Sequence, residues 1–237
     1  TLDTNVLKLK IPGNDKNVGK KVLAAFSWVY KNIEFDYLVR ITTSTYLDIK
    51  SLYEYINLLD HVPNYGGDKL VYYDKIKKEK VNFASGANLV LSKKCVKILI
   101  DNKNSWDHNQ YDDVNIGKIL HENLKIDITQ FNIQKFENYP LKKDINLQNY
   151  HFRFRLDLYN FPRFLEVLVF EIIHFRVVNK NNKSIVYKFC NLLIDLLAKP
   201  LFFVFQKINP KIYTYKFRSF KYRTGVKIRE ILTNLNK

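Results

Sequence analysis

The chain has 237 residues, of which 46% are hydrophobic and 15% aromatic, so it can bury one sizeable core or two small ones and is not a disordered chain. The net charge of +16 is uneven, because residues 150–237 hold 17 Lys and Arg against 5 Asp and Glu, and carry +12 where residues 1–149 carry +4. This excess predicts an anionic partner, which composition leaves open between nucleic acid, a lipid surface and a phosphorylated ligand.

The cysteines and the apolar runs indicate whether the chain holds a disulfide, a zinc site or a membrane-spanning helix. Cys95 and Cys190 lie far apart, each inside an apolar run, which favours buried thiols over a disulfide or a zinc site. No uncharged apolar run reaches the roughly 18 residues that a membrane-spanning helix needs. The sequence opens on Thr1 and contains no Met, so we expect a fragment or processed product without a signal peptide. The compartment stays open.

Hydrophobic periodicity predicts alternating helices and strands over the first half of the chain. Strands are expected over residues 6–11, 35–41, 69–73 and 83–91, the last broken at Ser85-Gly86. Helices are expected over 18–30, 48–59, 93–101 and 112–122, with Asp48 and Ser92 as N-caps of the second and third. The segment 61–68 is predicted to be a loop. This alternation favours an α/β fold, a sheet with helices on its faces.

The pattern changes near Tyr150. Residues 151–156 alternate basic and aromatic side chains as a strand would, and Pro162 opens a predicted helix that reaches Val178. A second helix is expected over 186–206, broken at Pro200, and the tail 211–223 interleaves aromatic and basic residues. We therefore predict an α/β domain over 1–149 and a basic, mostly helical region over 150–237.

Three segments, in order, carry a resemblance to a known family. They are Asp36-Tyr-Leu-Val-Arg-Ile-Thr-Thr-Ser-Thr-Tyr-Leu-Asp48, Phe83-Ala-Ser-Gly-Ala-Asn-Leu-Val-Leu-Ser92 and Tyr111-Asp-Asp-Val-Asn-Ile-Gly117. Together they resemble the fringe-like β-1,3-glycosyltransferases, and the resemblance covers residues 18–122. It implies a GT-A-like, Rossmann-like mixed sheet flanked by helices. In that family more than one strand-helix unit precedes the first motif, so the resemblance also implies a truncated or shortened nucleotide-binding part here.

In the first segment the family has a metal-binding acidic triplet, and this chain has Thr42, Thr43 and Ser44 instead. Hard carboxylate ligands for a divalent ion are therefore missing, and no metal-binding residue is predicted. Mn²⁺ or Mg²⁺ stays an open alternative. The resemblance implies that these three residues and Arg40 contact the donor. For Arg40 the alternative is a structural ion pair with Asp36 or Asp48.

The second and third segments supply the sugar pocket and the reactive acid. The resemblance implies that Ser85, Gly86 and Ala87 line the sugar pocket, where glycine allows close approach of a ligand. It implies that Asp113 is the catalytic base of an inverting transfer and that Asp112 orients it or substitutes for it. Acids at a helix N-terminus are also favourable by about 0.3–1 kcal/mol for the helix alone, which is the structural alternative.

An inverting transfer from a nucleotide-sugar donor, most favourably a UDP-sugar, to a glycan or glycoconjugate hydroxyl needs a cation beside the leaving diphosphate. His151, Arg153 and Arg155 would share one face of a strand after the acid pair, where the family keeps a histidine near the diphosphate. The alternative is an edge strand whose basic face meets solvent.

Four further residues are candidates for the acceptor side. Gly66 and Gly67 would line an acceptor cleft or form a plain turn, and Trp106 and Tyr111 would stack on a sugar or pack in the core or its rim.

Two other functions compete with transfer. The aromatic and basic tail suits nucleic acid, although it holds no recognisable binding motif, so nucleic acid is the less favoured partner. The C-terminal helices suit peripheral contact with an anionic membrane, with Phe202, Phe203 and Phe205 inserted. A GT-A-like domain that has lost its activity is a further alternative.

Overall fold

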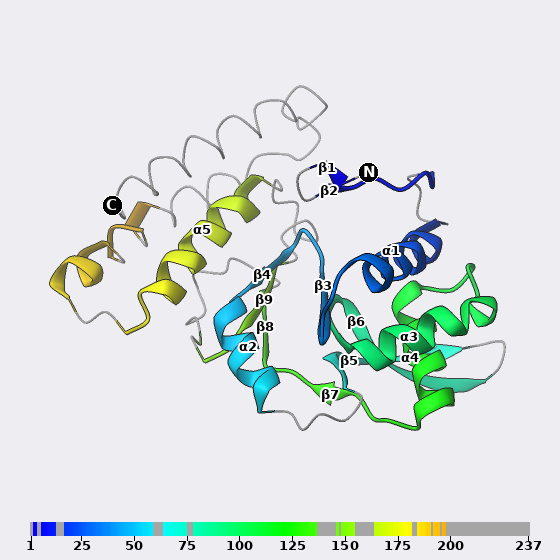
Figure 1. Ribbon diagram of the computed structural model, residues 1–237. Helices are drawn as coiled ribbons and strands as arrows, with labels where there is room; N and C mark the ends of the chain where they lie inside the picture. Colours follow the sequence, from blue (N-terminus) through cyan, green and yellow to red (C-terminus); the bar gives the residue numbers. More distant parts are fainter. Residues whose placement is uncertain are drawn as a thin grey trace, which may run out of the picture. The chain divides into compact units, whose positions relative to one another are not determined.

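The computed structural model divides the chain into two compact units, which are considered separately (Figure 1). The first unit comprises Thr1–Thr43 and Tyr55–Asn132, and the second comprises Ser44–Glu54 and Ile133–Lys237. The structure describes residues 2–3, 6–12, 17–58, 64–74, 78–136, 146, 148–154, 164–181, 184–190, 192–194 and 196–197. The expectations for Arg155, Pro162, Pro200, the phenylalanines at 202, 203 and 205, and the tail 211–223 lie outside these residues.

The first unit is built on a mixed four-stranded sheet in the order β3-β6-β5-β7. These strands are β3 (Tyr37–Ile41), β5 (Tyr65–Asp74), β6 (Glu79–Ser92) and β7 (Thr129–Gln130). β3 and β5 are antiparallel to β6, and β7 is parallel to β5. A separate pair, β1 (Leu2–Asp3) and β2 (Val6–Leu7), forms a small antiparallel ribbon, shorter than the strand predicted over 6–11.

Three helices pack with this sheet: α1 (Val18–Asn32), α3 (Lys93–Asp101) and α4 (Asp112–Leu124) (Figure 1). A 3-10 turn, Lys103–Ser105, follows α3. The core between helices and sheet is apolar, with Leu89 and Leu91 of β6 and Val96 and Leu99 of α3 fully buried. This burial stabilises the unit.

The second unit holds a mixed three-stranded sheet in the order β4-β9-β8. The strands are β4 (Thr45–Leu47), β8 (Ile133–Phe136) and β9 (His151–Phe154), with β9 antiparallel to β4 and parallel to β8. Helix α5 (Phe164–Val178) packs on it, since the rings of Phe154 and Phe170 lie 5.2 Å apart. Residues 185–190, 192–194 and 196–197 are also helical. Helix α2 (Ile49–Asn57) begins in this unit, and its last turn belongs to the first.

The α/β class predicted from the sequence is confirmed, as two mixed sheets flanked by helices. The predicted N-caps are also present. The Oδ1 atom of Asp48 accepts the N–H of Ser51 at 3.3 Å, and Oγ of Ser92 accepts the N–H of Cys95 at 3.4 Å. Local hydrogen bonding of this kind can be read from sequence because both partners lie within one turn.

Two expectations about the glycines are corrected. β5 starts at Tyr65, so Gly66 and Gly67 lie inside a strand and not in a loop over 61–68. β6 continues through Ser85-Gly86 as one strand, although its register with β5 shifts there. The predictions failed because glycine was taken as a strand breaker. At Gly66 a Cβ atom would lie 2.6 Å from the ring of Phe131, so glycine is the residue that allows this ring to pack on the strand. Among the described residues no helix is long and apolar enough to cross a membrane.

Candidate active site

The acid pair lies in the first turn of α4, as predicted. The loop before it is held by Asn115, whose side-chain amide accepts the N–H of Asp107 at 2.9 Å and donates to the carbonyls of Asp107 and Tyr111 at 2.8 and 3.1 Å. Asn115 is buried, so these bonds fix the chain where it enters the helix. The position of Asp112 and Asp113 is therefore set by a residue one turn further along.

Gly117 brings α4 against the sheet. A Cβ atom at this position would lie 2.6 Å from the carbonyl oxygen of Asn82 and 3.0 Å from Cα of Phe83, both on β6. No side chain fits there, and the helix consequently packs backbone to backbone on the strand that carries Gly86. The glycine of the Asp-Asp-Val-Asn-Ile-Gly segment thus positions the acid pair without touching it.

Asp113 bonds to the backbone of the sugar-pocket segment. Its Oδ2 atom accepts the N–H of Gly86 at 3.1 Å, and its Oδ1 atom accepts the N–H of Val114 at 3.0 Å. Burial raises the pKa of the Asp113 carboxyl, and the neighbouring charge of Asp112 adds to the rise, while the Gly86 N–H and Arg40 oppose it. The carboxylate is therefore more basic than that of an exposed aspartate.

Asp112 has a different partner, because it forms an ion pair with the guanidinium of Arg40. Arg40 lies near the end of β3, opposite Leu89 of β6. The alternative partners expected for it, Asp36 and Asp48, are wrong; Asp48 instead pairs with Lys180 at 3.5 Å. The side chains of Arg40 and Asp112 are 22% and 13% exposed, so the pair is largely shielded from solvent.

Gly86 makes room for the arginine. A Cβ atom there would lie 3.0 Å from Nη1 and 3.2 Å from Cζ and Nη2 of Arg40, so the guanidinium lies directly over the backbone of this residue. Gly86 therefore leaves the space that the arginine occupies and holds Asp113 with its N–H. The sequence predicted the close approach, although of a ligand and not of a protein cation.

An irregular stretch of β6 creates this geometry. Between the pairs Gly67 with Leu89 and Lys69 with Ala84 the register shifts, so residues 85–88 face Asp68 alone. At Gly67, φ is +153° and a Cβ atom would lie 2.1 Å from the carbonyl oxygen of Asn88, so only glycine is accommodated. Such bulges commonly redirect backbone groups near active sites, and this one directs the Gly86 N–H toward α4.

Asn88, in the same bulge, is fully buried, and its amide has no hydrogen-bond partner within the described part of the chain. Buried amides are normally satisfied, so this residue marks the bulge as unusual. Ser85 and Ala87 are buried as well, and Oγ of Ser85 accepts the N–H of Ala87 at 3.4 Å. Tyr65 supports the bulge from β5, because its hydroxyl accepts the N–H of Ala84 at 2.7 Å.

The predicted donor residues Thr42, Thr43 and Ser44 connect β3 to β4. Thr43 ends the first segment of the first unit, and Ser44 begins the first segment of the second. Ser44 is buried, and its carbonyl accepts the N–H of Phe154 at 2.9 Å. In the described ranges no group of three or more His, Cys, Asp or Glu side chains could hold a metal ion.

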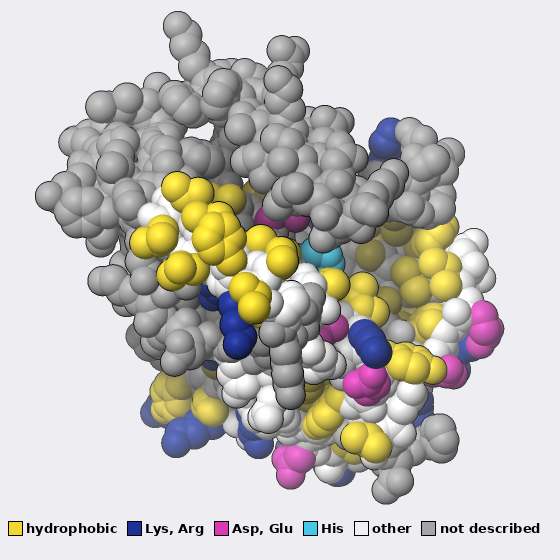
Figure 2. Space-filling view, turned by 90° about the vertical axis from the view of Figure 1, so that its left-hand side faces the viewer, with side chains coloured by type: hydrophobic (Ala, Val, Ile, Leu, Met, Phe, Trp, Pro, Cys, Tyr) yellow, Lys and Arg dark blue, Asp and Glu magenta, His cyan; other side chains and the backbone are white. Residues whose placement is uncertain are grey.

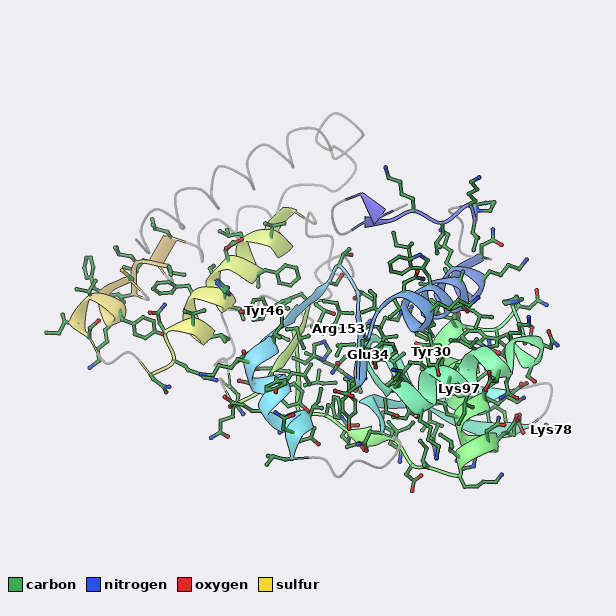
Figure 3. All side chains as sticks on the ribbon, viewed as in Figure 1. Tyr30, Glu34, Tyr46, Lys78, Lys97 and Arg153 are labelled. Atoms are coloured by element: carbon green, nitrogen blue, oxygen red, sulfur yellow. The ribbon has the colours of Figure 1, made fainter. Side chains whose placement is uncertain are left out.

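His151 and Arg153 lie on β9 in the second unit, and the register pairs Arg153 with Lys135 of β8, so the three residues share one face of the sheet. Arg153 is labelled in Figure 3. His151 is buried, and neither ring nitrogen has a hydrogen-bond partner among the residues that the structure describes. Burial, together with the nearby charges of Arg153 and Lys135, lowers the pKa of His151 to about 3. This histidine is therefore neutral, and the positive charge of the face comes from Arg153 and Lys135.

A second polar cluster in this unit has no counterpart in the sequence interpretation. The hydroxyl of Tyr46 on β4 lies 2.8 Å from Nδ1 of His174 on α5. Burial raises the pKa of Tyr46 to about 12, and the charges of Asp48 and Glu171 contribute. Tyr46 and His174 lie more than a hundred residues apart in the sequence, so hydrophobic periodicity could not predict this contact.

Of the four residues expected on the acceptor side, three are buried and one is exposed. Trp106 is buried, and its Nε1 donates to the carbonyl of Leu99 at 3.2 Å, which is a packing role. Tyr111 is 69% exposed directly before the acid pair, and its ring meets that of Tyr72 edge to face at 6.3 Å. Gly66 and Gly67 are buried in β5. Of these four residues, Tyr111 alone is exposed to solvent.

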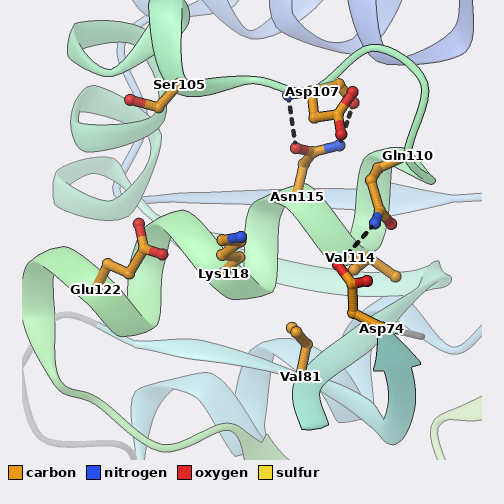
Figure 4. Close-up of a pocket in the computed structure, with 9 residues that line it drawn as sticks. All are labelled: Asp74, Val81, Ser105, Asp107, Gln110, Val114, Asn115, Lys118 and Glu122. Atoms are coloured by element: carbon orange, nitrogen blue, oxygen red, sulfur yellow. Dashed lines mark hydrogen bonds between the residues drawn. The ribbon is translucent and has the colours of Figure 1, made fainter. Parts of the chain in front are cut away.

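A cavity of about 290 Å³ lies along the flank of α4 (Figure 4). Its lining residues are Asp74, Val81, Ser105, Asp107, Gln110, Val114, Asn115, Lys118 and Glu122. None of the predicted site residues is among them. Nδ2 and Oδ1 of Asn115 are engaged in holding Asp107, and Nε2 of Gln110 donates to Asp74 at 3.4 Å, so much of the cavity wall supports the loop before the acid pair.

Among the residues that sequence reasoning did not select, Asn115 and Tyr65 matter most. An asparagine inside a helix is unfavourable unless its side chain bonds elsewhere, and this signal could have identified Asn115. Tyr65 gave no such signal, since its partner is a backbone amide on a neighbouring strand.

Comparison with models of known protein families matched none of them, and comparison with curated proteins gave no significant match.

Proposed function

We propose that the first unit is the catalytic part of a GT-A-like inverting glycosyltransferase. The donor is a nucleotide sugar, with a UDP-sugar favoured, and the acceptor is a hydroxyl of a glycan or glycoconjugate. The observation that carries the proposal is the carboxylate of Asp113, held by the Gly86 N–H in a partly buried position beside the Arg40–Asp112 ion pair. The order of the three sequence motifs supports the same assignment.

Asp113 has the properties of a general base. A base works best when its pKa approaches the working pH, and burial moves the pKa of this carboxyl upward from the ordinary aspartate value. Its two backbone hydrogen bonds fix the carboxylate without neutralising it. Asp112 is less suited to this task because its carboxylate is already paired with a cation.

Arg40 supplies the cation that the missing acidic triplet would otherwise hold through a metal. As the diphosphate leaves, negative charge grows on its oxygens, and an oriented guanidinium stabilises such charge through paired hydrogen bonds. Asp112 holds the guanidinium in place, and Gly86 lets it lie against the backbone. The Arg40 side chain is 22% exposed, so the ion pair is not fully closed off from solvent.

In this mechanism the acceptor oxygen attacks the anomeric carbon from the side opposite the diphosphate. The new carbon–oxygen bond forms as the bond to the diphosphate oxygen breaks, and that oxygen keeps the electron pair. The acceptor proton passes to Asp113. The roles expected for His151 and Arg153 concern the second unit and stay predictions.

The test is Asp113→Asn with a panel of nucleotide sugars. We expect transfer to fall by about a hundredfold to ten-thousandfold while donor affinity stays close to that of the wild type. The variant should fold at neutral pH, because a carboxyl with a raised pKa favours its neutral form, and an amide is neutral too. Asp101→Asn, at the exposed end of α3, is the matched control and should keep full activity.

A thermal-shift screen of the panel, with and without Mn²⁺, identifies the donor. Wild-type protein that binds no nucleotide sugar would contradict the proposal. Donor binding without transfer to any acceptor would instead indicate a GT-A-like domain that has lost its activity.

A further inference from the structure

The helical residues 185–190, 192–194 and 196–197 leave many apolar side chains exposed to solvent. We call this set the exposed stripe, and its exposures range from 40% at Leu193 to 83% at Ile185. Its members are Ile185, Val186, Phe189, Leu192, Leu193, Leu196 and Leu197. Single exposed apolar residues are ordinary, but seven within thirteen positions require an explanation.

The spacing places these side chains on one side of a helix. Ile185, Phe189, Leu192 and Leu196 follow one another at intervals of four, three and four, and the remaining members of the stripe adjoin this row. Tyr187, Cys190 and Ile194 fall on a different side of the helix and are half-buried. The ring of Tyr187 lies 5.5 Å from that of Phe175 on α5. The helix therefore packs on α5 with one apolar side and presents a second one outward.

Figure 2 shows hydrophobic side chains gathered on this face of the second unit, with dark blue Lys or Arg side chains beside them. Lys188, on the polar side of the same helix, is exposed. Lys180, two residues after the end of α5, is also exposed and donates to Oγ of Ser51 at 3.0 Å. The sequence of residues 150–237 carries +12, so the apolar stripe lies in the strongly basic part of the chain.

We propose that the exposed stripe inserts into the interface of an anionic lipid bilayer, with the surrounding lysines and arginines at the phosphate headgroups. An amphipathic helix with Leu, Ile and Phe on one side and basic residues nearby is the type that lies in the plane of a membrane surface. The charge of the region complements anionic lipid and adds an attraction for each basic residue near the surface. This inference concerns the second unit and does not depend on the proposed transfer reaction.

Two other occupants fit less well. A second copy of the chain would bring two regions of +12 together, which opposes association. An oligonucleotide would be recognised by stacking on aromatic rings, whereas six of the seven residues in the stripe are aliphatic. An anionic lipid bilayer can bury the apolar side chains of the exposed stripe and also attract the positive charge of the region.

The test is sedimentation of the full chain with vesicles of phosphatidylcholine, alone or mixed with phosphatidylglycerol. We expect binding to the mixed vesicles, weaker binding to the neutral ones, and a further loss at about 1 M salt, where the Debye length is about 3 Å. Replacing Leu192→Glu together with Leu196→Glu should weaken binding to the mixed vesicles at least about tenfold. Leu58→Glu, at a leucine that is 82% exposed in the other unit, is the matched control and should bind as the wild type does.

Thermal unfolding separates a folding defect from a binding defect, since both substituted leucines are exposed and the double variant should keep the wild-type Tm. A second variant, Leu196→Trp, keeps an apolar side chain and should bind normally while its added fluorescence is quenched by bromine-labelled phospholipid. Equal binding by the double variant, or binding without quenching, would overturn the proposal. So would a dimer or an oligonucleotide complex that the double variant abolishes while vesicle binding persists.

Discussion

Asp112 and Asp113 are adjacent in sequence but have different environments, and this difference decides their roles. Asp112 neutralises Arg40, whereas Asp113 accepts hydrogen bonds from the backbone and keeps a free charge when ionised. Neighbouring carboxylates are commonly divided in this way between an acid that is paired and an acid that reacts.

The pH dependence of transfer tests the assignment of Asp113. A base must be ionised, so kcat/KM should fall as the pH drops through the pKa of Asp113, at a pH above that of an ordinary aspartate, about 4. Asp112→Asn removes a charge that raises this pKa and should move the acid limb to lower pH. Arg40→Gln removes a charge that lowers it and should move the limb upward. Shifts of the same sign in both variants would exclude Asp113 as the titrating group.

Gly86→Ala tests the contact between the arginine and the backbone. The added methyl group would lie 3.0–3.2 Å from the guanidinium, so Arg40 must shift by a few tenths of an ångström. We expect donor KM to rise about tenfold, equivalent to about 1.4 kcal/mol, with a smaller change in Tm. Isothermal titration with a nucleotide sugar measures the first effect and calorimetry the second. An unchanged affinity would show that the position of the guanidinium is not important for the donor.

At the scale of elements, the close packing of α4 on β6 positions the acid pair. Helix propensity alone would favour alanine over glycine inside α4 by about 1 kcal/mol. The backbone of β6 leaves no room for a Cβ atom at Gly117, so packing outweighs propensity there.

Gly117→Ala should therefore destabilise the protein by about 1–3 kcal/mol, as overpacking does when the opposing atoms are backbone and cannot move aside. Gly19→Ala in α1 is the control, because the nearest atoms to its Cβ would be at 3.4–4.0 Å, an ordinary contact. Chemical denaturation of both variants measures the difference. If Gly117→Ala were as stable as Gly19→Ala, this result would contradict the close packing of α4 on β6 at Gly117.

At the scale of the whole molecule, the described residues include carboxylates and histidines in both units, yet they gather no metal-binding cluster. Together with the residues Thr42, Thr43 and Ser44 in place of the acidic triplet, this predicts that a chelator leaves Tm and donor binding unchanged. Thermal shift in EDTA, with and without nucleotide sugar, makes the comparison. A loss of donor binding that Mn²⁺ restores would refute the metal-free part of the proposal and leave Asp113 as the base.

Much of the first unit was predictable because its signals are local. Apolar residues at helical spacing predicted α1, α3 and α4, and the caps at Asp48 and Ser92 involve partners within one turn. The short strand β4 was missed, because three residues carry too little periodicity and its formation depends on pairing with β9.

The sequence by itself determined the α/β class, the position of the acid pair in the first turn of a helix, and the basic character of the C-terminal region. Only the tertiary structure decided that Arg40 pairs with Asp112, that Gly86 holds Asp113, and that Gly66 and Gly67 belong to a strand. The physical reason is the same in each case. A helix cap is decided within one turn, whereas these contacts join side chains and backbone tens of residues apart, and which of them meet depends on how β6 and α4 pack.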